Sequence, residues 1–71
     1  MGLNIEGYTI KVERERSLGG WMDIHYSCFR DSDKFEVCSG VGSLLGLSHK
    51  SSVYAYIRRR VREVQDEEIK T

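Results

Sequence analysis

Three stretches in which apolar and polar residues alternate fill residues 8 to 41, and one helical stripe of apolar residues follows them. Alternation with a period of two is typical of half-buried strands. The strands present three apolar sets, one from each stretch: Tyr8, Ile10 and Val12; Met22, Ile24, Tyr26 and Cys28; and Phe35, Val37 and Val41. The helical stripe contains Val53, Ile57, Val61 and Val64, with Tyr54 alongside. This spacing gives a helix one apolar face that can pack on the sheet. The sequence therefore predicts an α+β fold: a three-stranded antiparallel β-meander followed by one long C-terminal α-helix packed on one sheet face (β-β-β-α).

The length of the chain fits one domain. We expect its 71 residues to form a single domain over residues 1–71, with modest stability because a small domain buries a smaller share of its surface. The matching periods of strands and helix predict the centre of the core, which we place at Ile24, Tyr26, Val37, Ile57 and Val61.

Glycines and polar residues mark the connections. Ser17-Leu18-Gly19 predicts a three-residue hairpin loop with Gly19 in the left-handed region. Between sheet and helix, Gly40, Gly42 and Gly46 interrupt the chain, and we expect the intervening leucines to cover the core: Leu44, Leu45 and Leu47. Ser48 is the expected helix cap, with Ser51 as the alternative.

The second hairpin is predicted from its polar residues. A four-residue turn over residues 30–33 places Cys28 opposite Phe35 and Tyr26 opposite Val37, so that turn length and hydrophobic register agree. In this register Cys28 and Cys38 point to opposite faces of the sheet. We therefore expect two free thiols.

Composition constrains the class of protein. The net charge is 0, from 11 basic and 11 acidic residues, whereas a dedicated nucleic-acid binder usually has a basic excess. No apolar run reaches the roughly 18 residues that would indicate a membrane span. Residues 1–7 lack a basic start and an apolar core, so we expect no secretory signal. Two cysteines are too few for a disulfide scaffold, which favours a reducing, cytoplasmic setting.

The expected order of elements resembles the small sheet-plus-helix DNA-binding domains of the integrase arm-binding and plant AP2 type. The resemblance is one of architecture and includes no matching motif. No functional residue is therefore carried over from it.

One row of side chains has the composition of a catalytic site. In the predicted register His25 lies opposite Cys38, and Lys11 or Glu13 completes the row, as in a nucleophile with its base. A flat sheet face offers no oxyanion donors, however, and the cysteines and histidines lack zinc-ligand spacing. We interpret the row as cross-strand packing and expect no catalytic residue, metal or cofactor.

The glycines before the helix have a different possible role. Their Gly-x-Gly-x-x-x-Gly spacing is one residue too long for a dinucleotide-binding loop, and no parallel crossover precedes it, so we interpret them as a flexible connector. The backbone N–H groups near Ser48, with His49 and Lys50 beside them, could instead hold an anion.

Aromatic residues on the other sheet face indicate a contact surface. Trp21, His25 and Phe29 share this face, and exposed aromatic residues in polar surroundings mark interfaces. Rings on an open sheet also occur in readers of single-stranded RNA. Here acidic residues are interleaved with them and would repel phosphates, so a protein contact is favoured: Glu13, Asp23 and Glu36.

The helix carries its charges in an order that opposes the helix dipole. Basic residues come first and acidic residues last: Arg58, Arg59, Arg60 and Arg62, then Asp66, Glu67 and Glu68. A solvated face tolerates this small penalty. The functional interpretation is a bipolar surface matched to a partner, such as an antiparallel copy of the chain, with Arg58 and Arg62 in the interface.

These observations predict a small non-enzymatic binding or regulatory protein that acts through protein–protein contact. We expect it to form a homodimer and not to bind a membrane. Short chains of this kind are common among phage and mobile-element regulators and inhibitors. The alternative is a nucleic-acid-binding regulator that uses the basic residues of the helix and its start: His49, Lys50, Arg58, Arg59 and Arg62.

Overall fold

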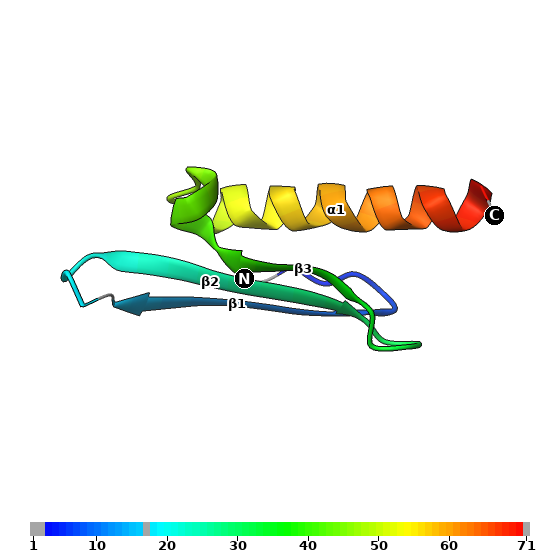
Figure 1. Ribbon diagram of the computed structural model, residues 1–71, viewed down its shortest axis with the longest axis horizontal. Coiled ribbons are helices and arrows are strands. Elements are labelled where there is room, and N and C mark those ends of the chain that lie inside the picture. The colour runs from blue at the N-terminus through cyan, green and yellow to red at the C-terminus, as the bar shows by residue number, and fades with distance from the viewer. Residues whose placement is uncertain (1–2, 17, 71) are drawn as a thin grey trace.

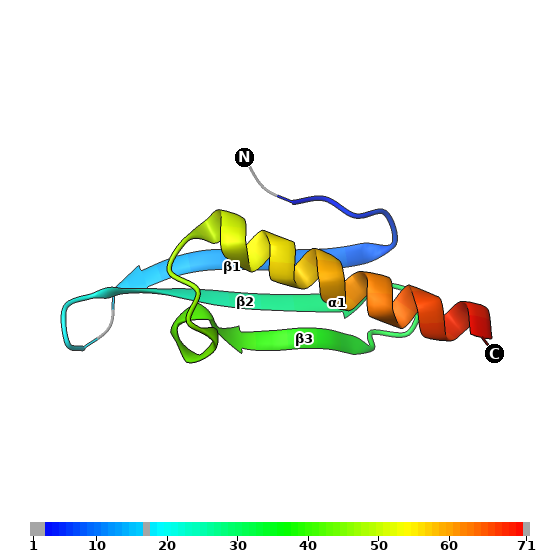
Figure 2. The ribbon, with the colours of Figure 1, turned by 90° about the horizontal axis from the view of Figure 1, so that it is seen from above.

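A three-stranded antiparallel sheet lies beneath one long helix in the computed structural model, which describes residues 3–16 and 18–70. The elements in chain order are β1 (Tyr8–Arg16), β2 (Met22–Arg30), β3 (Glu36–Val41), the 3-10 helix η1 (Gly42–Leu45) and α1 (Lys50–Lys70). The strands are ordered β1-β2-β3, and α1 crosses one face of the sheet diagonally (Figures 1 and 2). The predicted β-β-β-α meander is confirmed.

The core lies between the sheet and α1. Its buried side chains come from β2, β3 and α1: Ile24, Tyr26, Cys28, Val37, Val53, Ile57 and Val61. All five residues predicted at its centre are among them, and each fully buried side chain of this kind contributes roughly 1.5–3 kcal/mol. Tyr56 adds a contact outside the predicted stripe, because its ring meets that of Tyr26 edge-on with centroids 5.7 Å apart.

The first hairpin has a longer connection than predicted. Arg16 pairs with Met22, so five residues, 17–21, join the strands, of which Ser17 lies outside the described part. Gly20, rather than Gly19, has the positive φ, at 93°. The tip of this hairpin extends past α1 (Figure 1). Met22, predicted to face the core, is therefore 49% exposed.

The turn of the second hairpin lies one residue later than predicted. The backbone N–H of Arg30 donates to the carbonyl of Phe35 at 2.8 Å, which makes residues 31–34 the loop. Lys34 takes a φ of 62°, and the Asp33 carboxylate accepts both the Phe35 N–H and the Arg30 guanidinium. These bonds fix the later turn. Phe35, predicted to be buried, is 47% exposed.

A bulge then changes the register of β3. Phe29 pairs with Glu36, but Cys28 pairs with Cys38, and the shift lies between Cys28 and Phe29. The prediction that Cys28 and Cys38 point to opposite faces is therefore wrong. Val37 is buried and Cys38 packs against the core, because a bulge lets two consecutive residues oppose one residue of the partner strand. Both thiols are free, as predicted, although on a different geometric basis.

The connection from β3 to α1 buries a glycine instead of two leucines. Gly42 is the buried residue of η1, and an added Cβ there would lie 2.9 Å from the carbonyl oxygen of Leu47. One 3-10 turn presents a single side to the core, so Leu44 and Leu45, predicted to cover it, are 84% and 43% exposed. Leu47 does pack against the core, as predicted.

The start of α1 also differs from the expected capping. The helix begins at Lys50, and the backbone carbonyl of His49 accepts hydrogen bonds from the N–H groups of Ser52 and Val53 at 3.1 and 3.2 Å. His49 therefore occupies the position predicted for Ser48 or Ser51.

Candidate interaction surfaces

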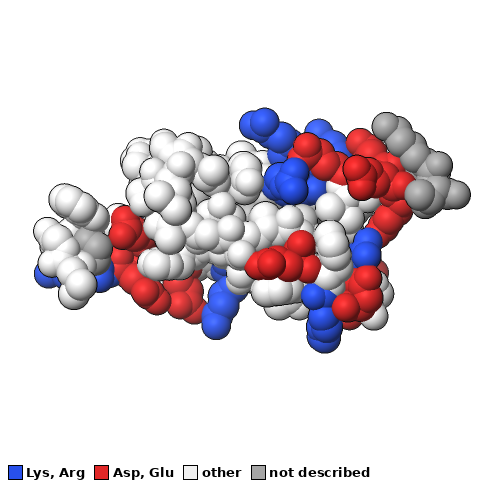
Figure 3. Space-filling model, in the orientation of Figure 1, with Lys and Arg blue, Asp and Glu red and all other residues white. Residues whose placement is uncertain are grey.

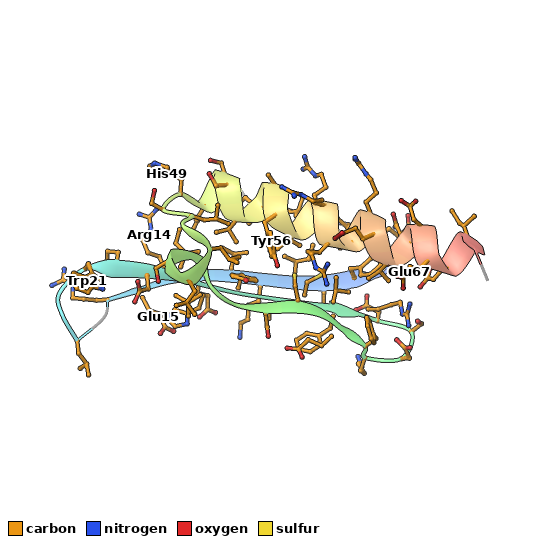
Figure 4. All side chains as sticks on the ribbon, turned by 45° about the horizontal axis from the view of Figure 1, so that its top comes forward. Arg14, Glu15, Trp21, His49, Tyr56 and Glu67 are labelled. Atoms are coloured by element: carbon orange, nitrogen blue, oxygen red, sulfur yellow. The ribbon has the colours of Figure 1, made fainter. Side chains whose placement is uncertain are left out.

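The three aromatic residues predicted for the open sheet face form a spread-out row. Trp21 precedes β2 at the tip of the first hairpin, where Figure 4 shows it, and its side chain is 68% exposed. An added Cβ on Gly19 would lie 3.3 Å from its ring, so the indole folds back over the turn. Phe29 lies near the other end of β2 and is half-buried. Eight strand residues span roughly 26 Å, so Trp21 and Phe29 do not form one patch.

His25 lies between them with different neighbours from those predicted. Its strand partners are Glu13 and Val41 rather than Cys38, because the later turn and the bulge together shift β3 by three residues. The His25 Nε2 atom is 3.6 Å from a carboxylate oxygen of Glu15. The expected row of histidine and cysteine is therefore not assembled. The exposed imidazole is left in an ion pair on the open face when it is protonated.

The predicted arginine surface is assembled on the solvent side of α1. Arg58, Arg59 and Arg62 surround Ala55 in a shallow depression on the solvent side of the helix. Among the described residues, no carboxylate lies within ion-pair distance of these three guanidinium groups. Arg60 instead pairs with Glu63 at 2.9 Å. The three arginines therefore form a basic surface without internal compensation.

The other two predicted basic residues lie at the beginning of the same helix. His49 is exposed just before α1, where Figure 4 shows it, and Lys50 is the first helical residue. Arg58 lies eight positions after Lys50 in the helix, which is roughly 12 Å along the axis. The helix has no acidic residue in its first turn. His49 and Lys50 extend the basic character of α1 toward its start but are not part of the arginine depression.

An ion-paired cluster, which the sequence did not predict, closes the opposite end of the sheet. Arg30 forms two hydrogen bonds with Asp33, at 2.7 and 3.0 Å, and a third with Glu68 of α1. Its guanidinium carbon is also 5.0 Å from the centroid of the Phe35 ring. The Arg30 guanidinium, followed by the Phe35 N–H, lowers the pKa of Asp33 to about 2. This cluster fastens the end of α1 to the second hairpin.

Exposed apolar residues gather near η1. Beside Leu44 and Leu45, a cavity of about 270 Å³ opens between the start of β2 and the connection to α1. It is lined by Met22, Asp23, Ile24, Ser43, Gly46, Leu47 and Ser48. Figure 3 shows uncharged side chains over this part of the molecule, whereas charged side chains gather around the C-terminal half of α1. The sequence does contain a sign of this exposed apolar surface. Leu44 and Leu45 are adjacent on a short connector between glycines, and such a connector cannot bury both side chains.

A second groove, of about 250 Å³, runs between β3 and the C-terminal half of α1. Apolar side chains of both elements line it together with charged groups: Phe35, Val37 and Val64, and Glu36, Arg60, Glu63 and Glu67. Glu67 is visible beside the end of the helix in Figure 4. Its mixture of apolar and charged residues of both signs is typical of a protein contact surface and not of an enclosed catalytic pocket.

The two thiols differ in accessibility. Cys28 is fully buried, and burial raises the pKa of its thiol to about 11. Cys38 is half-buried, and burial also raises the pKa of its thiol, although nearby Arg60 opposes the shift. Both groups are therefore held as thiols at neutral pH, which is the unreactive form.

Comparison with known proteins assigns no relative. No protein-family model matches the chain, and no curated protein or solved structure shows significant similarity to it. Over residues 3–16 and 18–70, no three histidine, cysteine or acidic side chains come together in a group that could hold a metal ion. Within the same residues, no helix has both the length and the apolar character needed to cross a membrane.

Proposed function

We propose that this chain is a small non-enzymatic binding protein that acts through protein–protein contact, first of all with a second copy of itself. The observation that supports this most strongly is the exposed apolar surface. Large hydrophobic side chains are at least 43% exposed at seven described positions: Leu18, Trp21, Met22, Phe35, Leu44, Leu45 and Ile69. Three of them, Met22, Leu44 and Leu45, lie beside one another around η1, and a group of exposed apolar side chains on a small domain marks an interaction site.

Sedimentation velocity over a range from low to high micromolar concentration tests the self-association. We expect the weight-average sedimentation coefficient to rise from that of a monomer to that of a dimer, because mass action populates the complex. A coefficient that stays monomeric throughout would remove the homodimer from the proposal.

A nucleic-acid-binding regulator is the second candidate, and the uncompensated arginine surface is the observation that favours it. Guanidinium groups without carboxylate partners are free to contact phosphates. Against this, the chain has no net charge and its open sheet face carries acidic residues, so few counterions would be released on binding.

Fluorescence anisotropy with labelled duplex and single-stranded DNA and RNA separates the two candidates. Under the favoured proposal, binding at physiological salt is weak for every probe. Tight binding that is lost in the Arg58→Glu/Arg62→Glu variant, but retained in Lys11→Glu/Lys34→Glu with the same change in net charge, would make the nucleic-acid function the better one.

A further inference from the structure

The β3 edge of the sheet is short and bulged, but it lacks most of the charged residues that discourage pairing with another strand. In the described residues, β3 pairs only with β2, and Figure 2 shows no segment beyond it on the other side. The strand contains no lysine, arginine or proline, and Glu36 is its only charged residue. Natural edge strands usually carry such residues because the unpaired backbone N–H and C=O groups otherwise bind another strand.

The β1 edge differs in its charge and in the segment that lies beside it. Charged residues occupy much of its length: Lys11, Glu13, Arg14, Glu15 and Arg16. Residues before β1 turn back on this side of the sheet in Figure 2, where Leu3 and Ile5 pack against the core. β1 is therefore a poor site for the addition of a strand, and β3 is the better one.

Exposed apolar side chains stand at both ends of β3. Phe35 directly precedes the strand, while Leu44 and Leu45 follow it in η1. Phe35 shares its groove with residues of α1, so it lies on the helix side of the sheet. The helix η1 rises on the same side, as Figure 1 shows. The two groups therefore lie on one face, separated by the length of the strand.

We propose that a second copy of the chain pairs antiparallel with β3, so that Phe35 of each copy packs against Leu44 and Leu45 of the other. This inference rests on the proposed function and names the contact that carries it. A two-fold axis through the middle of β3 brings the start of each strand beside the end of its partner. The product is one continuous sheet with three strands from each copy.

The distribution of charge is compatible with this arrangement. Glu36 is the first residue of β3, so antiparallel pairing keeps the two Glu36 residues at opposite ends of the contact, roughly 17 Å apart along the strands. Arg60 and Glu63 face the same groove as an ion pair, so the net charge of the groove comes from Glu36 and Glu67. A second copy satisfies the exposed backbone groups and all three exposed apolar side chains at once.

Sedimentation velocity of charge variants tests the interface. We expect Phe35→Glu and Leu44→Glu each to weaken dimerisation by at least about tenfold, because each variant buries a carboxylate against an apolar surface. Leu18→Glu adds the same charge at the tip of the first hairpin and should leave the dimer unchanged. The replaced side chains are exposed, and circular dichroism of each variant establishes that it folds.

Each alternative outcome has a distinct meaning. A wild-type chain that never dimerises contradicts both this interface and the homodimer of the proposed function. A dimer that survives Phe35→Glu and Leu44→Glu but is lost in Trp21→Glu/Phe29→Glu contradicts the β3 interface and leaves protein–protein contact standing. Binding of a different protein through β3 without self-association would refute the second copy as the occupant.

Discussion

The two edges of this sheet are paired to the same central strand, yet they differ in what they expose. The β1 edge is long and carries alternating charges, whereas the β3 edge is short, nearly uncharged and flanked by Phe35 and the leucines of η1. If strand length alone mattered, β1 would be the edge more prone to pair with another strand. We infer that charge matters more than strand length for the protection of an edge, and that the apolar residues at the ends of β3 favour pairing there.

The largest effect we predict concerns the core that holds both edges in place. Ile57 is a residue of α1 that is fully buried against the sheet, so Ile57→Ala should lower the free energy of unfolding by about 2–5 kcal/mol, through lost burial and the cavity left behind. Urea denaturation followed by circular dichroism measures this. Leu18→Ala, at an exposed position, is the control and should change stability by less than about 0.5 kcal/mol. Equal effects would show that α1 does not anchor the sheet.

A lysine placed on each edge in turn compares the edges directly. Ser39→Lys puts a positive charge on each copy near the two-fold axis of the proposed dimer, and we expect it to weaken association by about tenfold or more. Thr9→Lys makes the matched change on β1 and should have little effect. Sedimentation velocity of both variants gives the two dissociation constants. If Thr9→Lys weakened association more than Ser39→Lys, β1 and not β3 would be the edge that pairs.

Thiol labelling sharpens the comparison at the level of single residues. Cys38 should react with a maleimide much faster than Cys28, because Cys28 is fully buried and its pKa is raised to about 11. Because Cys38 lies on β3, its labelling should also slow as the protein concentration rises. Mass spectrometry of digested samples follows both sites. Faster labelling of Cys28 would contradict the described burial.

The smallest predicted effect concerns the turn that positions Phe35 at the start of β3. The pKa of Asp33 is lowered to about 2 by Arg30 and the Phe35 N–H. Its contribution to stability is therefore present above the unfolded-state pKa of about 3.9 and is lost as the pH falls through about 2. Thermal melts at several pH values should show a smaller loss over this window for Asp33→Asn than for the wild type. Identical profiles would show that the Asp33 contacts do not stabilise the turn.

The sequence predicted those parts of the fold that depend on periodicity. Ile24 and Ile57 repeat at strand and helix spacing, so their burial could be predicted without knowledge of the turns. The register of β3 could not, because it depends on the left-handed φ of Lys34 and on a bulge, and neither leaves a period in the sequence. The bulge moved Cys38 from the open face to the core side, and the later turn and the bulge together separated it from His25.

The candidate surfaces were predicted less completely for the same reason. Arg58 and Arg62 lie on the solvent side of α1, where helical spacing alone could place them. The apolar surface around β3 arises from Phe35 and Leu44, which the sequence pattern assigned to the core. Phe35 is exposed because the turn lies later than predicted, and Leu44 is exposed because η1 buries Gly42 instead. Both causes lie in the connections between elements, where the sequence has no hydrophobic period.

Hydrogen exchange of the backbone amides tests most directly the claim that β3 is the adhesive edge. Exchange is measured by mass spectrometry at low and at high micromolar protein, and residues 36–41 are compared with residues 8–16. We expect exchange in β3 to slow as the protein concentration rises, because pairing with a second copy satisfies its outward N–H groups, while exchange in β1 stays unchanged. Slowing confined to β1, or no dependence on concentration in either strand, would contradict this claim.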